Sequence, residues 1–284
     1  MQSRIQPDIQ MHKLAMLAAA VFTIMIYYGT YDESFATVQT DQNSPQQQQQ
    51  QPNIDASALF DSHTMVLGNN VKNLVILIPN EAHESTNQAA NQYPLANQPY
   101  LPQNAVVNTG TTVMWFNGDV DHDRTITLVQ GDSIPSSETE SSTPAAAVFD
   151  SGSFEYNTAS TPETFNDTGT YTYYEKDVNE DDPAFVMNGT VTVINQPESS
   201  SLSSGDGSDT VGVLMVPTQD IQTYTTDLQN RGFAIESTHN FKDIRGGQSG
   251  TGDEQTLIVW TTSGMTLSDI ATNLQEFTPG LPYS

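Results

Sequence analysis

Six short runs of β-branched and aromatic residues, separated by turn-forming residues, limit most strongly what this chain can fold into. They lie at residues 73–78, 105–108, 111–116, 125–129, 171–174 and 190–194. Valine, isoleucine, threonine and aromatic side chains favour pleated strands, and the Gly, Pro, Asn and Asp clusters between the runs favour turns. The pattern therefore predicts a mainly β domain, a sandwich or small barrel, over residues 60–195.

After residue 210 the pattern changes from strands alone to strands that alternate with helices. Strand-like runs lie at 211–216, 233–235 and 256–261. Apolar residues recur at helical spacing in two segments, with Ile221, Tyr224 and Leu228 in the first and Leu267, Ile270, Leu274 and Phe277 in the second. The order strand, helix, strand, strand, helix predicts a small α+β (βαββα) domain over residues 211–284.

The N-terminal segment has the composition of an export signal. Residues 1–36 combine Arg4 and Lys13 with an apolar run at 14–28, and they end in a small-x-small pattern, Ser-Phe-Ala. The apolar run is shorter than the ~20 residues of a comfortable spanning helix, so the segment is either a cleaved signal peptide or a membrane-anchor helix. Both alternatives predict an extracytoplasmic protein, secreted or anchored to the outer face of the cytoplasmic membrane. Membrane contact follows only if the segment stays uncleaved.

Two polar segments divide the rest of the chain. Residues 37–59 include six consecutive glutamines and predict a disordered tether. Residues 196–210 are rich in serine and glycine and predict a flexible linker. These boundaries give two folded units, at 60–195 and at 211–284.

The composition excludes several classes of function. The chain has 34 acidic and 8 basic residues, a formal net charge of -26, and such a surface repels the phosphates of nucleic acids. It has no cysteine and therefore no disulfide. Because no Gly-x-Ser-x-Gly turn or other activated nucleophile is recognisable, the protein is not expected to be an enzyme.

Two stretches carry a family resemblance. They are GTTVMWFNGDVDHDRTITL at 110–128 and GTYTYYEKDVNEDDPAFVMNGTVTVI at 169–194. Their strand motifs resemble those of the cupredoxins, the blue-copper proteins, and the resemblance implies a Greek-key β-sandwich with a copper site at one end. In that family a histidine precedes the first Thr-rich strand, and a cysteine, a histidine and a methionine follow the Gly-Thr-Tyr strand. The corresponding positions here hold Arg124 and Glu175, and only the methionine, Met187, is retained.

The loss of these ligands has a chemical consequence. A blue-copper site requires a thiolate and imidazoles in its plane, and its axial methionine binds only weakly. The domain is therefore expected to hold no cofactor. On this alignment Arg124 and Glu175 converge on the metal position, where a guanidinium can bind a carboxylate through two hydrogen bonds. The alternative is that loops direct both charges to water.

Acidic residues gather near the same positions and could hold a cation weakly, either calcium or, with a histidine, copper(II). These residues are Asp119, Asp121, His122, Asp123, Asp177 and Glu180. Their spacing lacks the glycine and the closing glutamate of a calcium loop, so a set of solvated loop residues is the alternative.

Two Asn-x-Thr patterns match the acceptor for N-linked glycosylation. They begin at Asn166 and at Asn188. Either would matter only in a host that modifies exported proteins.

Together these features predict an exported or membrane-anchored cell-surface protein. Its degenerate, copper-free cupredoxin-like domain would act as a binding or structural module for an unknown protein or cell-surface partner. The rival interpretation, implied by the family resemblance, is a copper-binding electron-transfer protein with a rearranged site.

Overall fold

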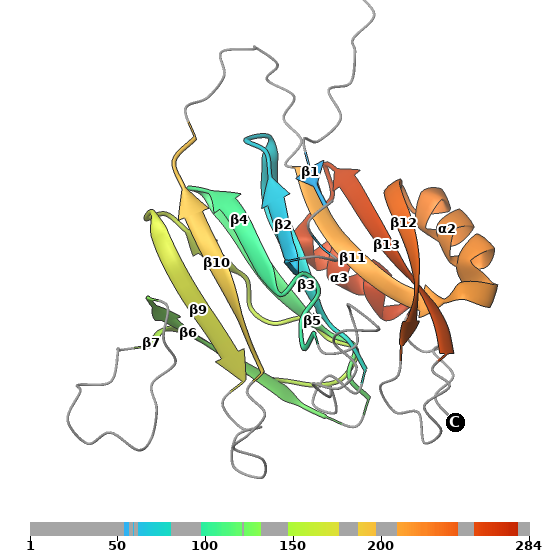
Figure 1. Ribbon diagram of the computed structural model, residues 1–284, viewed down its shortest axis with the longest axis horizontal. Helices are drawn as coiled ribbons and strands as arrows, with labels where there is room; N and C mark the ends of the chain where they lie inside the picture. The colour runs from blue at the N-terminus through green and yellow to red at the C-terminus, as the bar shows by residue number, and fades with distance from the viewer. Residues whose placement is uncertain are drawn as a thin grey trace, which may run out of the picture. The chain divides into compact units, whose positions relative to one another are not determined.

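Two β-sheets and two helices make up the part of the chain that the computed structural model describes (Figure 1). The described residues are 54–56, 59, 62–80, 98–120, 122–131, 147–175, 187–196, 209–243 and 253–277. The predicted leader at 1–36 lies outside them, as does most of the predicted tether. No helix within the described ranges is both long and apolar enough to cross a membrane.

Sheet A has seven strands in the order β1-β2-β4-β10-β9-β6-β7. In that order the strands are Ile54–Asp55, Thr64–Leu67, Asn104–Asn108, Asn188–Ile194, Gly169–Glu175, Arg124–Gln130 and Ala147–Phe154. Sheet B has six strands in the order β12-β13-β11-β3-β5-β8. These are Ala234–Asp243, Asp253–Ser263, Asp209–Pro217, Val71–Ile78, Thr111–Asn117 and Glu163–Phe165. All six strand-like runs of the first half fall within strands, which confirms the mainly β class.

The two sheets pack face to face as a β-sandwich, which is the architecture that the family resemblance implied. Strand β10 shows how the sequence achieves this, because its alternating small, apolar and threonine residues bury Gly189, Val191 and Val193 on one face. Aromatic rings close the space between the sheets. Trp115 of β5 lies edge-on to Tyr173 of β9, with ring centroids 5.3 Å apart.

The second half of the chain has the predicted order of elements. Strand β11 is followed by a short 3-10 turn at Thr218–Asp220, helix α2 at Ile221–Asn230, strands β12 and β13, and helix α3 at Leu267–Gln275. Thr266 caps α3 by accepting the backbone N–H of Asp269, whose side chain in turn accepts the N–H of Thr266. Arg231, directly after α2, lies over the ring of Phe277 at 4.9 Å.

This α+β segment shares a sheet with the sandwich. Strand β11 pairs in parallel with β3, with Val211 opposite Leu74 and Gly212 opposite Val75. Residues 50–284 form one compact unit, and independent folding of the two units on either side of residues 196–210 stays a prediction. The composition of β11 explains why it pairs with β3. It is apolar on both faces and buried along almost its whole length, so it requires a neighbouring strand and cover on both sides.

Candidate functional site

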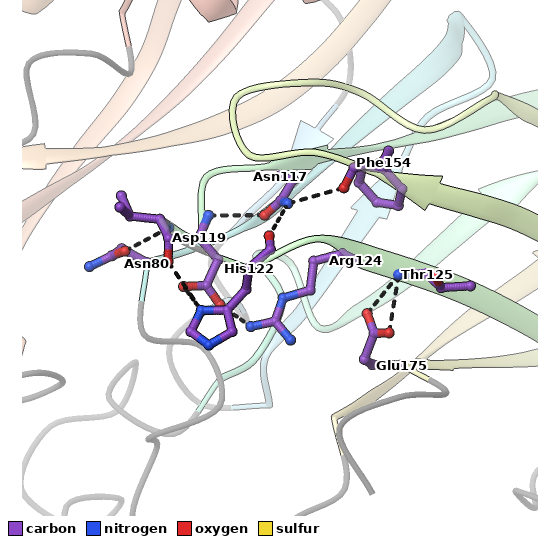
Figure 2. A network of polar contacts seen from close by, with 9 residues as sticks. Asn80, Asn117, Asp119, His122, Arg124, Thr125, Phe154 and Glu175 are labelled. Atoms are coloured by element: carbon purple, nitrogen blue, oxygen red, sulfur yellow. Dashed lines mark hydrogen bonds and ion pairs between the residues drawn. The ribbon is translucent and has the colours of Figure 1, made fainter. Parts of the chain in front are cut away.

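The loop between β5 and β6, residues 118–123, forms one end of the sandwich next to the start of β6. The side chain of Asn117, the last residue of β5, organises this loop (Figure 2). Its Oδ1 accepts the backbone N–H of Asp119 at 3.0 Å, and its Nδ2 donates to the carbonyl of His122 at 2.8 Å. Asn80 supports the same loop, because its Oδ1 accepts the N–H of Val120 at 2.9 Å. The loop is therefore held in place by buried amide side chains.

A buried ion pair lies within this framework. Arg124 donates to the carboxylate of Asp119, and the two residues are 2% and 0% exposed. The ring of His122 approaches the same carboxylate, with its Nδ1 3.7 Å from Asp119 Oδ1. The His122 side chain is 44% exposed, so it lies at the boundary between this ion pair and solvent.

Glu175, the other predicted member of the pair, makes a different contact. Both of its carboxylate oxygens accept the backbone N–H of Thr125, at 3.1 and 2.9 Å. Its own N–H donates to the carbonyl of Met187 at 3.1 Å. Glu175 is 1% exposed and Met187 is fully buried, so this corner of the site is closed to water.

The predicted ion pair between Arg124 and Glu175 is therefore wrong, because Arg124 pairs with a different carboxylate. Among the described residues, the ion pair of Arg124 is made with Asp119. The register explains the difference: Ile126 lies opposite Glu175, so the carboxylate of Glu175 reaches the backbone at Thr125. The Arg124 side chain instead points into the loop (Figure 2). The alternative, with both charges in water, is also wrong, because both side chains are buried.

Tyr100 lies close enough to Glu175 and Arg124 for both charges to act on it, and no motif in the sequence pointed to this residue. It is fully buried, and burial raises its pKa well above the usual value, with the negative charge of Glu175 adding to the increase and Arg124 opposing it. Both charged groups therefore act on the same buried hydroxyl, as expected for residues that converge on one end of the sandwich. Among the described residues, the Tyr100 hydroxyl has no hydrogen-bond partner. Its ring packs edge-on against Tyr173 at 4.9 Å.

These side chains do not fit a blue-copper site. The guanidinium of Arg124 offers hydrogen-bond donors and no lone pair for a metal, and the Asp119 carboxylate is already bound to it. Met187, the one retained family ligand, binds copper weakly without a thiolate and imidazoles. Within the described ranges, no three His, Cys, Asp or Glu side chains lie close enough together to hold a metal ion.

The structure describes only some residues of the predicted acidic cation site. Asp119 is engaged by Arg124, and Asp123 is exposed. Asp121, Asp177 and Glu180 lie outside the described residues. Weak binding of calcium or copper(II) by this cluster therefore stays a prediction.

Sequence comparison yields no matching family model and no match among curated proteins. Solved structures similar to part of the chain include reduced rusticyanin, with 13% identity over 47% of this chain and 85% of that chain, at a TM-score of 0.33. Reduced auracyanin from Roseiflexus castenholzii is 16% identical over 43% of this chain and 97% of that chain, at a TM-score of 0.30. The Cu(I) form of an amicyanin P52G mutant is 24% identical over 32% of this chain and 70% of that chain, at a TM-score of 0.23.

Proposed function

We propose that this protein is an exported or membrane-anchored cell-surface protein whose cupredoxin-like domain binds no copper and acts as a binding or structural module. The observation that carries the proposal is the buried Asp119–Arg124 ion pair at the position where the family resemblance places a copper ligand. Arg124 neutralises the carboxylate of Asp119, so the two side chains bridge loop and strand where a metal would otherwise do so.

The rest of the former copper site supports the same conclusion. The family's cysteine position holds Glu175, whose carboxylate is satisfied by the Thr125 backbone. The chain has no cysteine at all, so no thiolate can come from elsewhere in it. A domain that retains this scaffold without its metal ligands is suited to binding or support rather than electron transfer.

The strand pairings place the ion pair far from the first described residue. Ile54 pairs with Leu67, at the end of sheet A where Asn108 and Ile194 also pair. Arg124 lies toward the opposite end, two residues before Ile126, which is the residue opposite Glu175. The loop that carries the ion pair is therefore at the end of the sandwich away from Ile54.

Metal analysis of the full chain tests the copper-free module. Protein purified without chelators is expected to contain far less than one equivalent of copper and to stay colourless when copper(II) is added. Stoichiometric copper with an intense blue absorption would instead establish the electron-transfer rival.

Location is tested separately by treating intact cells with a protease that cannot enter them. The proposal expects the chain to be cleaved while a cytoplasmic marker survives. Full protection of the chain, with release only on lysis, would contradict export.

A further inference from the structure

The two Asn-x-Thr patterns occupy different environments. Asn166, Asp167 and Thr168 form the short connection between β8 and β9, and all three residues are exposed. Hydrogen bonds at both ends hold this connection in place. The carbonyl of Phe165 accepts the N–H of Gly110 at 2.7 Å, and the Tyr171 hydroxyl donates to the carbonyl of Asp167 at 3.2 Å. The acceptor pattern is thus presented on a supported surface turn.

The second pattern lies inside a sheet. Asn188, Gly189 and Thr190 belong to β10, which is paired with β4 on one side and β9 on the other. The Thr190 hydroxyl already donates to Asn104 Oδ1 at 2.9 Å, and Gly189 is buried. A transferase cannot reach this asparagine and threonine together without separating strands of sheet A.

We propose that Asn166 is a site of N-linked glycosylation and that Asn188 is not. The substrate class is an oligosaccharide carried on a lipid pyrophosphate. The bond between Asn166 Nδ2 and sugar C1 forms, and the bond from C1 to the pyrophosphate oxygen breaks. The lipid pyrophosphate leaves with the bonding electrons, and one amide proton passes to a base of the transferase. The choice of Asn166 over Asn188 rests on the exposure of the first pattern and on the strand pairing of the second. Glycosylation of Asn166 in the cell also requires the proposed export.

The position of Asn166 is compatible with the proposed module. Gly169, which follows the acceptor pattern, pairs with Val193 at the end of the sandwich that also holds Ile54. The Asp119–Arg124 pair lies at the other end. A glycan on Asn166 would therefore leave the loop that carries the ion pair uncovered.

Glycosylation of the folded chain in vitro tests the site independently of export. The full chain, made in a host without N-glycosylation, is incubated with a single-subunit transferase that recognises Asn-x-Thr and with its lipid-linked oligosaccharide. Intact-mass measurement is expected to show one added glycan. The addition should disappear in Asn166→Gln and in Thr168→Ala, and it should persist in Thr168→Ser and in Asn188→Gln.

A synthetic peptide spanning residues 163–171 serves as the control for transferase activity. An unmodified folded chain beside a modified peptide would overturn the proposal, and so would a glycan that survives Asn166→Gln. In cells that glycosylate exported proteins, an unmodified chain found outside the cytoplasm would also overturn it. A chain retained in the cytoplasm would overturn export, while the result in vitro would still decide the site.

Discussion

At the scale of single residues, the Asp119–Arg124 pair is the feature on which the end of the sandwich depends. Both side chains are buried, and removing one partner of a buried ion pair leaves an uncompensated charge that costs about 3–5 kcal/mol. We therefore expect Arg124→Met to lower the free energy of unfolding by about 3 kcal/mol, measured by urea denaturation.

Two controls separate the ion pair from a general effect of charge in the loop. Asp123→Asn changes an exposed neighbour and should alter stability by no more than about 0.5 kcal/mol. The double variant Asp119→Leu/Arg124→Met removes both charges and should be more stable than Arg124→Met alone. Equal losses in all three variants would show that the pair has no special energetic role.

Tyr100 provides a second test at this scale. Its buried hydroxyl has no hydrogen-bond partner in the part of the chain that the structure describes, and such a group costs about 1–3 kcal/mol. Tyr100→Phe should therefore leave the unfolding free energy unchanged or raise it by about 1 kcal/mol. Tyr173→Phe is the matched control, because its hydroxyl donates to the Gln103 carbonyl at 2.8 Å and its loss should be destabilising. A lower unfolding free energy for Tyr100→Phe than for Tyr173→Phe would contradict this interpretation of Tyr100.

The same tyrosines predict a dependence of stability on pH. Burial raises the pKa of both Tyr100 and Tyr173 well above the usual value. In the unfolded chain they ionise near pH ~10, so above that pH the unfolded state binds fewer protons than the native state and stability falls as pH rises. Urea midpoints should decline between about pH 9 and about pH 11, and the decline should be smaller in Tyr100→Phe. Equal slopes of the urea midpoint against pH in the wild type and in Tyr100→Phe would exclude a contribution from Tyr100.

At the scale of elements, the close contact between β11 and β13 fixes how the second half of the chain packs. Gly212 lies directly opposite Trp260, and a Cβ at Gly212 would lie 2.3 Å from the Trp260 ring. Trp260 also packs edge-on against Phe233, with ring centroids 5.0 Å apart. The glycine is thus needed for space rather than for a turn.

We therefore expect Gly212→Ala to destabilise the protein by about 1–3 kcal/mol, the usual cost of overpacking a core. A smaller ring should relieve the overlap, so Gly212→Ala should cost less in a Trp260→Phe background than in the wild type. Thermal or urea unfolding of the four proteins in this cycle provides the measurement. Strictly additive losses of unfolding free energy would mean that the alanine side chain at position 212 does not contact the Trp260 ring.

The outer strands show how the described sheets limit pairing with other chains. Strands β1 and β8 have only 2 and 3 residues. The longer outer strands, β7 and β12, carry irregularities in register with their neighbours. Short or bulged edges are poor templates for another strand, so a binding module built on this fold would use its loops or faces rather than an added strand.

At the scale of the whole molecule, the sandwich and the α+β segment are expected to depend on each other. Strand β11 covers the edge of β3, and Asn73 Nδ2 donates to Thr210 Oγ1 at 3.0 Å across this contact. At another point Asn157 Nδ2 donates to the carbonyl of Gln275 at 2.9 Å, at the end of α3. Apolar residues of both segments belong to one continuous core.

A chain that ends at residue 195 should therefore lose cooperative unfolding, because the edge of β3 and the core side chains beneath β11 become exposed. A chain that begins at residue 50 keeps the compact unit of residues 50–284 and should unfold like the full protein. Circular dichroism during urea denaturation distinguishes the two. A cooperative transition in the shorter chain, at the midpoint of the full protein, would support two independent domains.

Strand and helix positions could be predicted from the sequence because they depend on local pattern. The alternation in β10 and the helical spacing of Leu267, Ile270 and Leu274 are visible without coordinates, and both elements form where predicted. Strands β1, β2 and β8 were missed, since runs of 2, 4 and 3 residues carry too little periodicity. Strand β7 was also missed, because this eight-residue edge strand is mostly exposed and contains Asp, Ser and Gly. The convergence of Arg124 and Glu175 on one buried end was inferred from the family resemblance rather than from pattern.

The sequence by itself determined the absence of a thiolate, the strongly acidic charge and the order of strands and helices, because composition and local periodicity are properties of the chain alone. The tertiary structure decided that Arg124 binds Asp119 and that β11 joins β3. Both outcomes depend on strand register and on which backbone edges meet. Contacts between residues far apart along the chain are set by the packing of the whole core.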